Sequence, residues 1–180
     1  MGEYSLFTGR LLRFAPPTSE DHAVIARWMQ DTDYQRMMED DPIRPLSVEQ
    51  VAAFNSGLSS DSFDFHLRTL ADGTLIGFVA LFDIKWKNGT SMMAMGIGEA
   101  AYRGKGYGSD ALRLLLGYAF RELNLYRVGL NVIAYNAPAI RAYERAGFQL
   151  EGRRRGMVYR DGERHDLLQY GILRAEWAGR

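Results

Sequence analysis

The stretch YRGKGYGSDALRLLLGYAF, residues 102–120, joins a loop with three alternating glycines to an apolar run that favours a helix. The glycines are Gly104, Gly106 and Gly108, a density that is costly inside a helix and unnecessary in an ordinary turn. A strand is expected just before the loop, at 91–98. Because the free N–H groups and the dipole at a helix N-terminus favour negative charge, this layout indicates a phosphate site. The local pattern also leaves open a flexible turn that binds no ligand.

Two other phosphate-binding patterns fit this loop poorly. A Walker loop requires G-x-x-x-x-G-K-[ST], and the stretch lacks that pattern. A dinucleotide fingerprint requires G-x-G-x-x-G within an early βαβ unit, whereas G-x-G-x-G here follows three strands expected to be antiparallel. A nucleotide-phosphate binder is therefore the weaker hypothesis.

The hydrophobic periodicity predicts a mixture of helices and strands along the whole chain. Strands are expected at 11–14, 64–70, 75–84, 91–98, 127–134, 148–159 and 163–173, and helices at 18–31, 47–57, directly after the glycine loop, and at 136–147. The segment 32–46 carries two prolines and is expected to be irregular. We expect an α+β, or mixed α/β, fold in one domain over residues 1–180. Its central twisted, mostly antiparallel sheet would have about seven strands flanked by about four helices.

Composition excludes several classes of function. The net charge is zero, so no general electrostatic argument favours nucleic acid or an anionic membrane as a partner. The absence of cysteine excludes disulfides, thiolate metal sites and a cysteine nucleophile. His22, His66 and His165 lie on different expected elements without ligand spacing, and no metal is expected. No apolar run approaches the ~20 residues of a membrane span or forms a signal peptide, which predicts a cytoplasmic protein.

Two motifs follow one another along the chain: R-x-x-G-x-G at Arg103, Gly106 and Gly108, and N-x-x-A-x-x-x-Y-x-x-x-G-F at Asn136, Ala139, Tyr143, Gly147 and Phe148. In this order they resemble the motifs of the GNAT superfamily of acyl-CoA-dependent N-acetyltransferases. The opening segment and the closing hairpin resemble the branch of ribosomal-protein N-terminal acetyltransferases and spermidine acetyltransferases.

The resemblance implies acetyl-CoA as the acyl donor and transfer of its acetyl group to a primary amine. The acceptor would be a protein N-terminus, a polyamine or another small amine. The implied cofactor-binding residues are Ile97, Gly98, Glu99, Arg103, Gly104, Lys105, Gly106, Tyr107, Gly108, Ser109, Asn136, Ala139 and Tyr143. In that family the loop backbone holds the pyrophosphate, and the end of the preceding strand pairs with the pantetheine arm. A backbone N–H at the strand end would polarise the thioester carbonyl.

Tyr143 would be the catalytic residue, because the family uses a tyrosine at this position to protonate the leaving thiolate. From the residues alone, the spacing of Ile140 and Tyr143 favours an aromatic that packs its helix on the sheet, and the surrounding motif is what favours the catalytic role. Asn136 could be an N-cap, a pantetheine ligand, or both. The ribosomal-protein branch often carries a glutamate base early in the strand before the loop, but Met92 to Met95 offer no carboxylate. Water, a carboxylate of 39–41 or no dedicated base remain open.

The acceptor site is expected from the variable segments 30–62 and 83–91. Glu39, Asp40 and Asp41 would attract a cationic amine or form a solvated loop, and Trp86 would wall the acceptor site or cover the core. Met37, Met38, Met92, Met93 and Met95 could line an adaptable pocket. The sequence leaves the acceptor and the oligomeric state undetermined, with a homodimer as one expectation. A non-catalytic CoA-binding sensor or scaffold is the alternative function.

Overall fold

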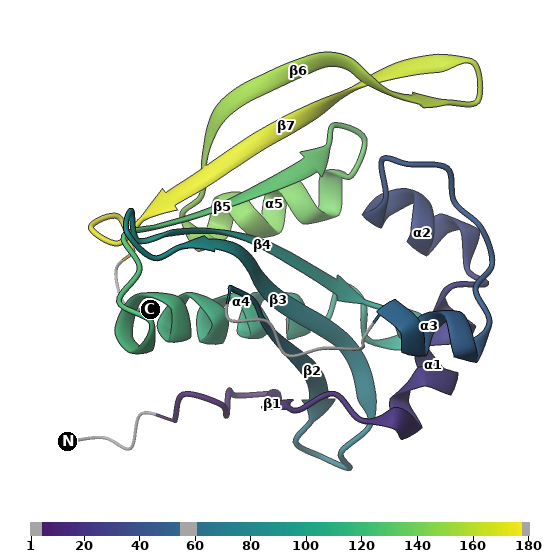
Figure 1. Cartoon of the computed structure of the whole chain (residues 1–180), viewed down its shortest axis with the longest axis horizontal. Coiled ribbons are helices and arrows are strands. Elements are labelled where there is room, and N and C mark those ends of the chain that lie inside the picture. Colours follow the sequence, from purple (N-terminus) through teal and green to yellow (C-terminus); the bar gives the residue numbers. More distant parts are fainter. Residues whose placement is uncertain (1–4, 55–60, 178–180) are drawn as a thin grey trace.

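Seven strands form one sheet in the order β1-β2-β3-β4-β5-β7-β6 (Figure 1). The computed structural model describes residues 5–54 and 61–177. The strands are β1 (Leu12–Ala15), β2 (Phe63–Thr69), β3 (Leu75–Lys85), β4 (Thr90–Ile97), β5 (Arg127–Ile133), β6 (Gln149–Arg160) and β7 (Glu163–Leu173). Every neighbouring pair is antiparallel except β4–β5, which is parallel. The expected sheet of about seven mostly antiparallel strands is confirmed.

Five α-helices flank the sheet within the described ranges. They are α1 (His22–Trp28), α2 (Thr32–Met38), α3 (Val48–Phe54), α4 (Tyr107–Gly117) and α5 (Ala137–Ala146). A π-helical turn, Tyr118–Glu122, extends α4. The helix expected at 47–57 begins with the expected capping box, in which Ser47 and Gln50 bond each other, while 55–57 lie outside the described residues.

Helix α2 corrects the expectation that the segment 32–46 is irregular. Asp31 caps the helix by accepting the N–H of Tyr34 at 3.0 Å, and Tyr34 and Gln35 bury one side of it. The prolines of the segment come after the helix has ended, so they do not interrupt it. The helix has seven residues, too few for a hydrophobic period to show in the sequence.

Strands β4 and β5 pair only where they begin. Thr90–Met92 lie beside Arg127–Gly129, and beyond these residues the two strands separate. Figure 1 shows β1 to β4 as one arm of the sheet and β5, β7 and β6 as a second arm that turns away from it. The sheet is therefore split by a wedge, and α2 lies at its open end.

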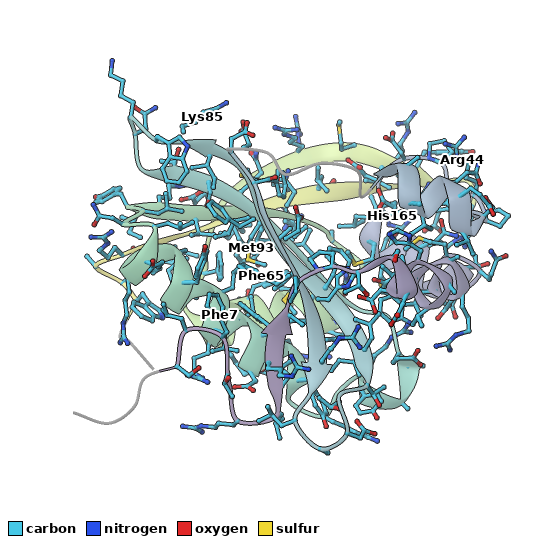
Figure 2. The ribbon with its side chains drawn as sticks, turned by 60° about the horizontal axis from the view of Figure 1, so that its bottom comes forward. Phe7, Arg44, Phe65, Lys85, Met93 and His165 are labelled. Atoms are coloured by element: carbon cyan, nitrogen blue, oxygen red, sulfur yellow. The ribbon has the colours of Figure 1, made fainter. Side chains whose placement is uncertain are left out.

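The main core lies between the sheet and helices α4 and α5. Apolar side chains of alternating strand residues pack against the leucines of α4 and against Tyr143 and Phe148. Phe65 and Met93 lie at the centre of the molecule, whereas Lys85 extends from the β3–β4 turn into solvent (Figure 2). In the described part of the chain, no helix is both long and apolar enough to cross a membrane.

A buried carboxylate fastens the segment before β1 to the first turn of α4. The Oδ2 atom of Asp110 accepts the backbone N–H groups of Arg10 and Leu11 at 2.8 Å and of Leu12 at 3.3 Å. A Cβ at Gly9 would lie 2.3 Å from that oxygen, so glycine is needed there. Burial opposes ionisation of Asp110, but the N–H groups of Leu11 and Arg10 and the Arg113 guanidinium hold its pKa below the ordinary 3.8.

We expect Asp110→Ala to lower the free energy of unfolding by about 2–4 kcal/mol, because three backbone N–H groups lose their acceptor. Urea denaturation at pH 7 measures the change. Asp33→Ala removes an exposed carboxylate and should change stability by no more than about 0.5 kcal/mol.

The difference in stability between the wild type and Asp110→Ala should also depend on pH. Since the folded-state pKa of Asp110 is depressed, its contribution is present above pH 3.8 and is lost as the pH falls below that value. The stability difference between the wild type and Asp110→Ala should therefore shrink on acidification. A difference that stays constant down to pH 2.5 would contradict this account.

Candidate active site

The glycine loop opens α4 with a row of backbone N–H groups. Gly104 and Gly106 have φ values of +72° and +90°, a conformation that side chains disfavour, and Gly106 is the N-cap of α4. Within the described residues, the N–H groups from Gly104 to Ser109 have no recorded acceptor, and the first bonded amide is Asp110, at 3.0 Å from the Gly106 carbonyl. The loop can therefore receive an anion on its main chain.

Arg103 points its side chain back toward the end of β4. Its guanidinium donates to the carbonyls of Ile97 at 2.9 Å and Gly98 at 2.8 Å, and lies 5.1 Å from the ring centre of Tyr34. A further contact reaches Asp31 at 3.2 Å. The Arg103 side chain thus ties the loop to the strand end and to α2.

The end of β4 is fixed from the side of α1. Glu99 pairs with Arg27 and accepts the indole N–H of Trp28 at 3.0 Å. Partial burial opposes its ionisation, but these two donors hold the pKa of Glu99 below its usual range. A Cβ at Gly98 would lie 2.0 Å from the Trp28 ring. Glu99 is therefore an ionised anchor for α1, which leaves it poorly suited to accept a proton.

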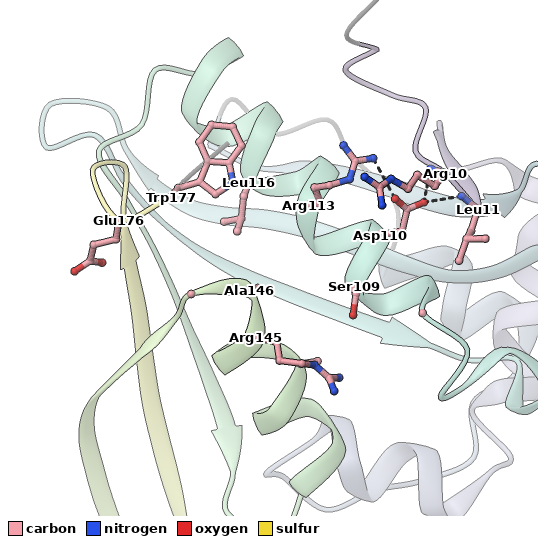
Figure 3. Close-up of a pocket in the computed structure, with 13 residues that line it drawn as sticks. Arg10, Leu11, Ser109, Asp110, Arg113, Leu116, Arg145, Ala146, Glu176 and Trp177 are labelled. Atoms are coloured by element: carbon pink, nitrogen blue, oxygen red, sulfur yellow. Dashed lines mark hydrogen bonds and ion pairs between the residues drawn. The ribbon is translucent and has the colours of Figure 1, made fainter. Parts of the chain in front are cut away.

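A cavity of about 740 Å³ begins at the glycine loop and runs between α4 and α5. Ser109 and Arg145 face it from the two helices, and Arg10 and Arg113 border it beside Asp110 (Figure 3). Of the predicted loop residues, Gly106 lines it, whereas Lys105 and Tyr107 are not among its lining residues. Sequence reasoning did not single out Arg10, Arg113 or Arg145. Because Ser109 and Arg113 are four residues apart, they share one face of the helix, and this spacing could have identified Arg113.

A second cavity, of about 260 Å³, lies in the wedge between β4 and β5. Helix α5 contributes Asn136, Ala139 and Tyr143 to it, so the structure brings these three predicted residues together. The remaining walls come from α2 and the segment just after it, and from strands β3, β4, β5 and β7; their residues are Met37, Met38, Asp40, Phe82, Met92, Met93, Ala94, Met95, Asn131, Val132, Ile133 and Leu167. As the sequence indicated, the 92–95 wall carries no carboxylate.

Tyr143 is buried yet lines this second cavity, with its ring against Phe148. No hydrogen bond of its hydroxyl is recorded within the described ranges. Burial raises the pKa of Tyr143 to about 12, so the hydroxyl keeps its proton at neutral pH. A protonated hydroxyl without a fixed partner, at the wall of a cavity, can donate to a bound group.

Asn136 uses both ends of its amide within the protein. Its Oδ1 accepts the N–H of Ala139 at 3.3 Å, which confirms the N-cap, and its Nδ2 donates to the carbonyl of Met37 at 3.0 Å. The hydroxyl of Tyr135 donates to the next carbonyl back, that of Arg36, at 2.5 Å. The start of α5 thus holds the end of α2 over the wedge.

The predicted acceptor residues separate in space. Asp40 lines the wedge cavity, but Glu39 and Asp41 do not, and their carbonyls accept the guanidinium of Arg160 at 2.7 and 2.8 Å. Partial desolvation, with the charges of Asp40 and Asp41, raises the pKa of Glu39. Trp86 lies at the β3–β4 turn, edge-on to Phe63, and lines neither cavity.

Comparison with known proteins gives this geometry a family context. Residues 11–149 match the acetyltransferase (GNAT) domain family. The chain is 32% identical over 120 residues to the uncharacterized N-acetyltransferase YokL from the SPbeta prophage of Bacillus subtilis, covering 67% of each protein. It is 29% identical over 110 residues to spermidine N(1)-acetyltransferase of Vibrio cholerae, covering 61% of this chain and 63% of that one.

A solved structure shares the fold. The crystal structure of spermidine N-acetyltransferase from Vibrio cholerae in complex with CoA and spermine superimposes with a TM-score of 0.83. The match covers 92% of this chain and 96% of that one at 22% identity, which establishes the fold alone. The expected resemblance to the branch that contains spermidine acetyltransferases is confirmed.

We expect Asn136→Ala to lower the free energy of unfolding by about 2 kcal/mol, through loss of the cap and of the bond to Met37. Asn136→Ser keeps a capping oxygen but cannot reach the Met37 carbonyl, so it should cost about 1 kcal/mol. Equilibrium urea unfolding distinguishes the two. A serine variant as stable as the wild type would show that the link to α2 contributes nothing.

Proposed function

Since the chain belongs to the GNAT acetyltransferase family and is an N-acetyltransferase that uses acetyl-CoA, we propose that it acetylates a small primary amine by direct attack, with Tyr143 as the general acid. The domain would comprise the whole of residues 1–180. The cofactor pyrophosphate would bind the main chain from Arg103 to Gly108, and the pantetheine arm would lie along the free edge of β4.

The observation that carries this proposal is the split between β4 and β5. Beyond Met92, the edge of β4 that faces β5 has no strand partner in the described structure. That edge leads from the loop at the head of α4 to the cavity that Tyr143 lines. Backbone groups that lack a partner inside a protein favour a ligand that can bond them, and an extended amide-containing arm is such a ligand.

The cofactor cavity between α4 and α5 supports the same assignment. CoA supplies a thioester-activated acetyl group and carries several phosphates, and Arg10, Arg113 and Arg145 offer positive charge beside the loop. The side chains of Asn136 and Arg103 are already bonded within the protein. We therefore assign them to positioning the wedge and the loop, and assign the phosphate contacts to main-chain N–H groups.

Acetyl transfer forms a bond from nitrogen to the acetyl carbonyl carbon and breaks the carbon–sulfur bond. One proton must leave the nitrogen of the neutral amine, and one must reach the sulfur; an amine that enters as an ammonium ion must lose a further proton before it attacks. Tyr143 would give its hydroxyl proton to the sulfur, because its pKa of about 12 keeps it protonated. Asp40 is the carboxylate residue that lines the cavity, and it would receive the proton from the amine, directly or through water.

We expect Tyr143→Phe to lower kcat by about 10²- to 10⁴-fold while the KM for acetyl-CoA changes by less than about threefold, because only proton donation is removed. Steady-state release of free thiol measures both constants. Tyr118→Phe makes the same atomic change at a core tyrosine that lines neither cavity, and should keep wild-type kcat. Full activity of Tyr143→Phe would contradict the assigned role.

We expect Gly106→Ala to weaken acetyl-CoA binding by about tenfold or more, since a Cβ at φ +90° must shift the N–H groups of the loop. Isothermal titration calorimetry gives the dissociation constant. Gly73→Ala is the matched control. Gly73 has φ +75° in the β2–β3 turn with open space around it, so it carries similar backbone strain away from both cavities. If Gly106→Ala and Gly73→Ala bound acetyl-CoA with equal affinity, the phosphates would not bind at the glycine loop.

A further inference from the structure

Methionine side chains are concentrated in the wedge cavity. The chain has eight methionines, and five of them line this cavity: Met37, Met38, Met92, Met93 and Met95. They come from two elements, α2 and β4. Thioether side chains are apolar, polarisable and flexible, and they adapt to apolar groups of varied shape. The thioethers therefore give a carbon skeleton an adaptable contact surface, beside polar lining groups such as Asp40 and Asn131.

Among the lining residues that the structure describes, charge is limited to one residue. Asp40 is the one ionisable acid or base among the described lining residues, apart from the neutral Tyr143 hydroxyl. The neighbouring Glu39 and Asp41 lie outside the lining. Arg160 donates to their carbonyls, which brings a positive charge to the same segment. A single carboxylate matches a single ammonium group.

The size of the cavity also restricts the acceptor. Its volume of about 260 Å³ is below the roughly 300–1,000 Å³ typical of small-molecule sites, and the acetyl group must share that space. The end of α2 covers the cavity. Its main chain is held there by hydrogen bonds from the side chains of Tyr135, Asn136 and Arg160. These bonds oppose enlargement of the site for a bulky acceptor.

We infer that the acceptor is a small primary monoamine with an apolar body, whose nitrogen approaches from Asp40 and whose carbon skeleton lies against the methionines. This inference rests on the proposed function. A polyamine would bring further ammonium groups against thioethers, and an unpaired charge that loses its water there is strongly disfavoured. The chain would thus differ in acceptor from the spermidine acetyltransferases that it resembles.

The test compares two acceptors of the same length, hexylamine and hexane-1,6-diamine, with spermidine as a third. Acetyl-CoA turnover is followed by thiol release at one pH, and acetyl-CoA binding is measured on the same sample. We expect kcat/KM for hexylamine to exceed that for the diamine by about tenfold or more. Diamine or spermidine turnover equal to or faster than hexylamine turnover would overturn the inference and leave the proposed function standing. Bound acetyl-CoA without turnover of any amine would overturn both.

Introducing a second carboxylate tests the charge argument directly. Met37 lines the cavity and is 40% exposed, so Met37→Glu can be made with little loss of packing. We expect Met37→Glu to lower the ratio of kcat/KM for hexylamine to kcat/KM for the diamine by about tenfold. Met157→Glu changes a methionine of similar exposure, 52%, on β6 outside the cavity, and should keep the wild-type preference. An unchanged preference in Met37→Glu would contradict the single-charge account.

Discussion

Between Met92 and Ile97, one edge of β4 carries backbone N–H and C=O groups that β5 does not use, because β5 has already turned away. Such groups cost about 1–3 kcal/mol each if they are buried without a partner, so an opening of this kind persists only where water or a ligand can reach it. The surrounding elements are arranged around this gap. Helices α4 and α5 close the core on one face, and α2 lies over the open end.

Helix α2 belongs to the N-terminal part of the sequence but is held by the C-terminal part. Tyr135, Asn136 and Arg160 donate to its last carbonyls and to those just after it, and Asp161 pairs with Arg36. The two arms of the split sheet are thereby joined a second time, across the opening. The wall of the wedge cavity that α2 forms and the strand pair that opens the wedge are consequently parts of one connected unit.

Features with local signals were predictable from the sequence. Strand alternation, the glycine loop at the head of α4 and the Asn136 cap all depend on residues within a few positions of one another. The missed features depend on distant partners. Asp110 accepts hydrogen bonds from residues 10–12, and Arg103 contacts Asp31. Arg10 and Arg145 line the same cavity. No short sequence pattern contains both members of any of these pairs. Helix α2 escaped prediction because its seven residues are stabilised by Asp31 and by buried contacts, while the prolines that follow suggested irregular chain.

The cavity between α4 and α5 takes its walls from both ends of the sequence as well as from the middle. Arg10 and Leu11 border it, and so do Glu176 and Trp177, whose ring lies tilted against Phe120 and under the Arg121 guanidinium. Trimming either end to obtain a smaller fragment would therefore remove part of the compartment beside the glycine loop, although the motifs themselves would survive.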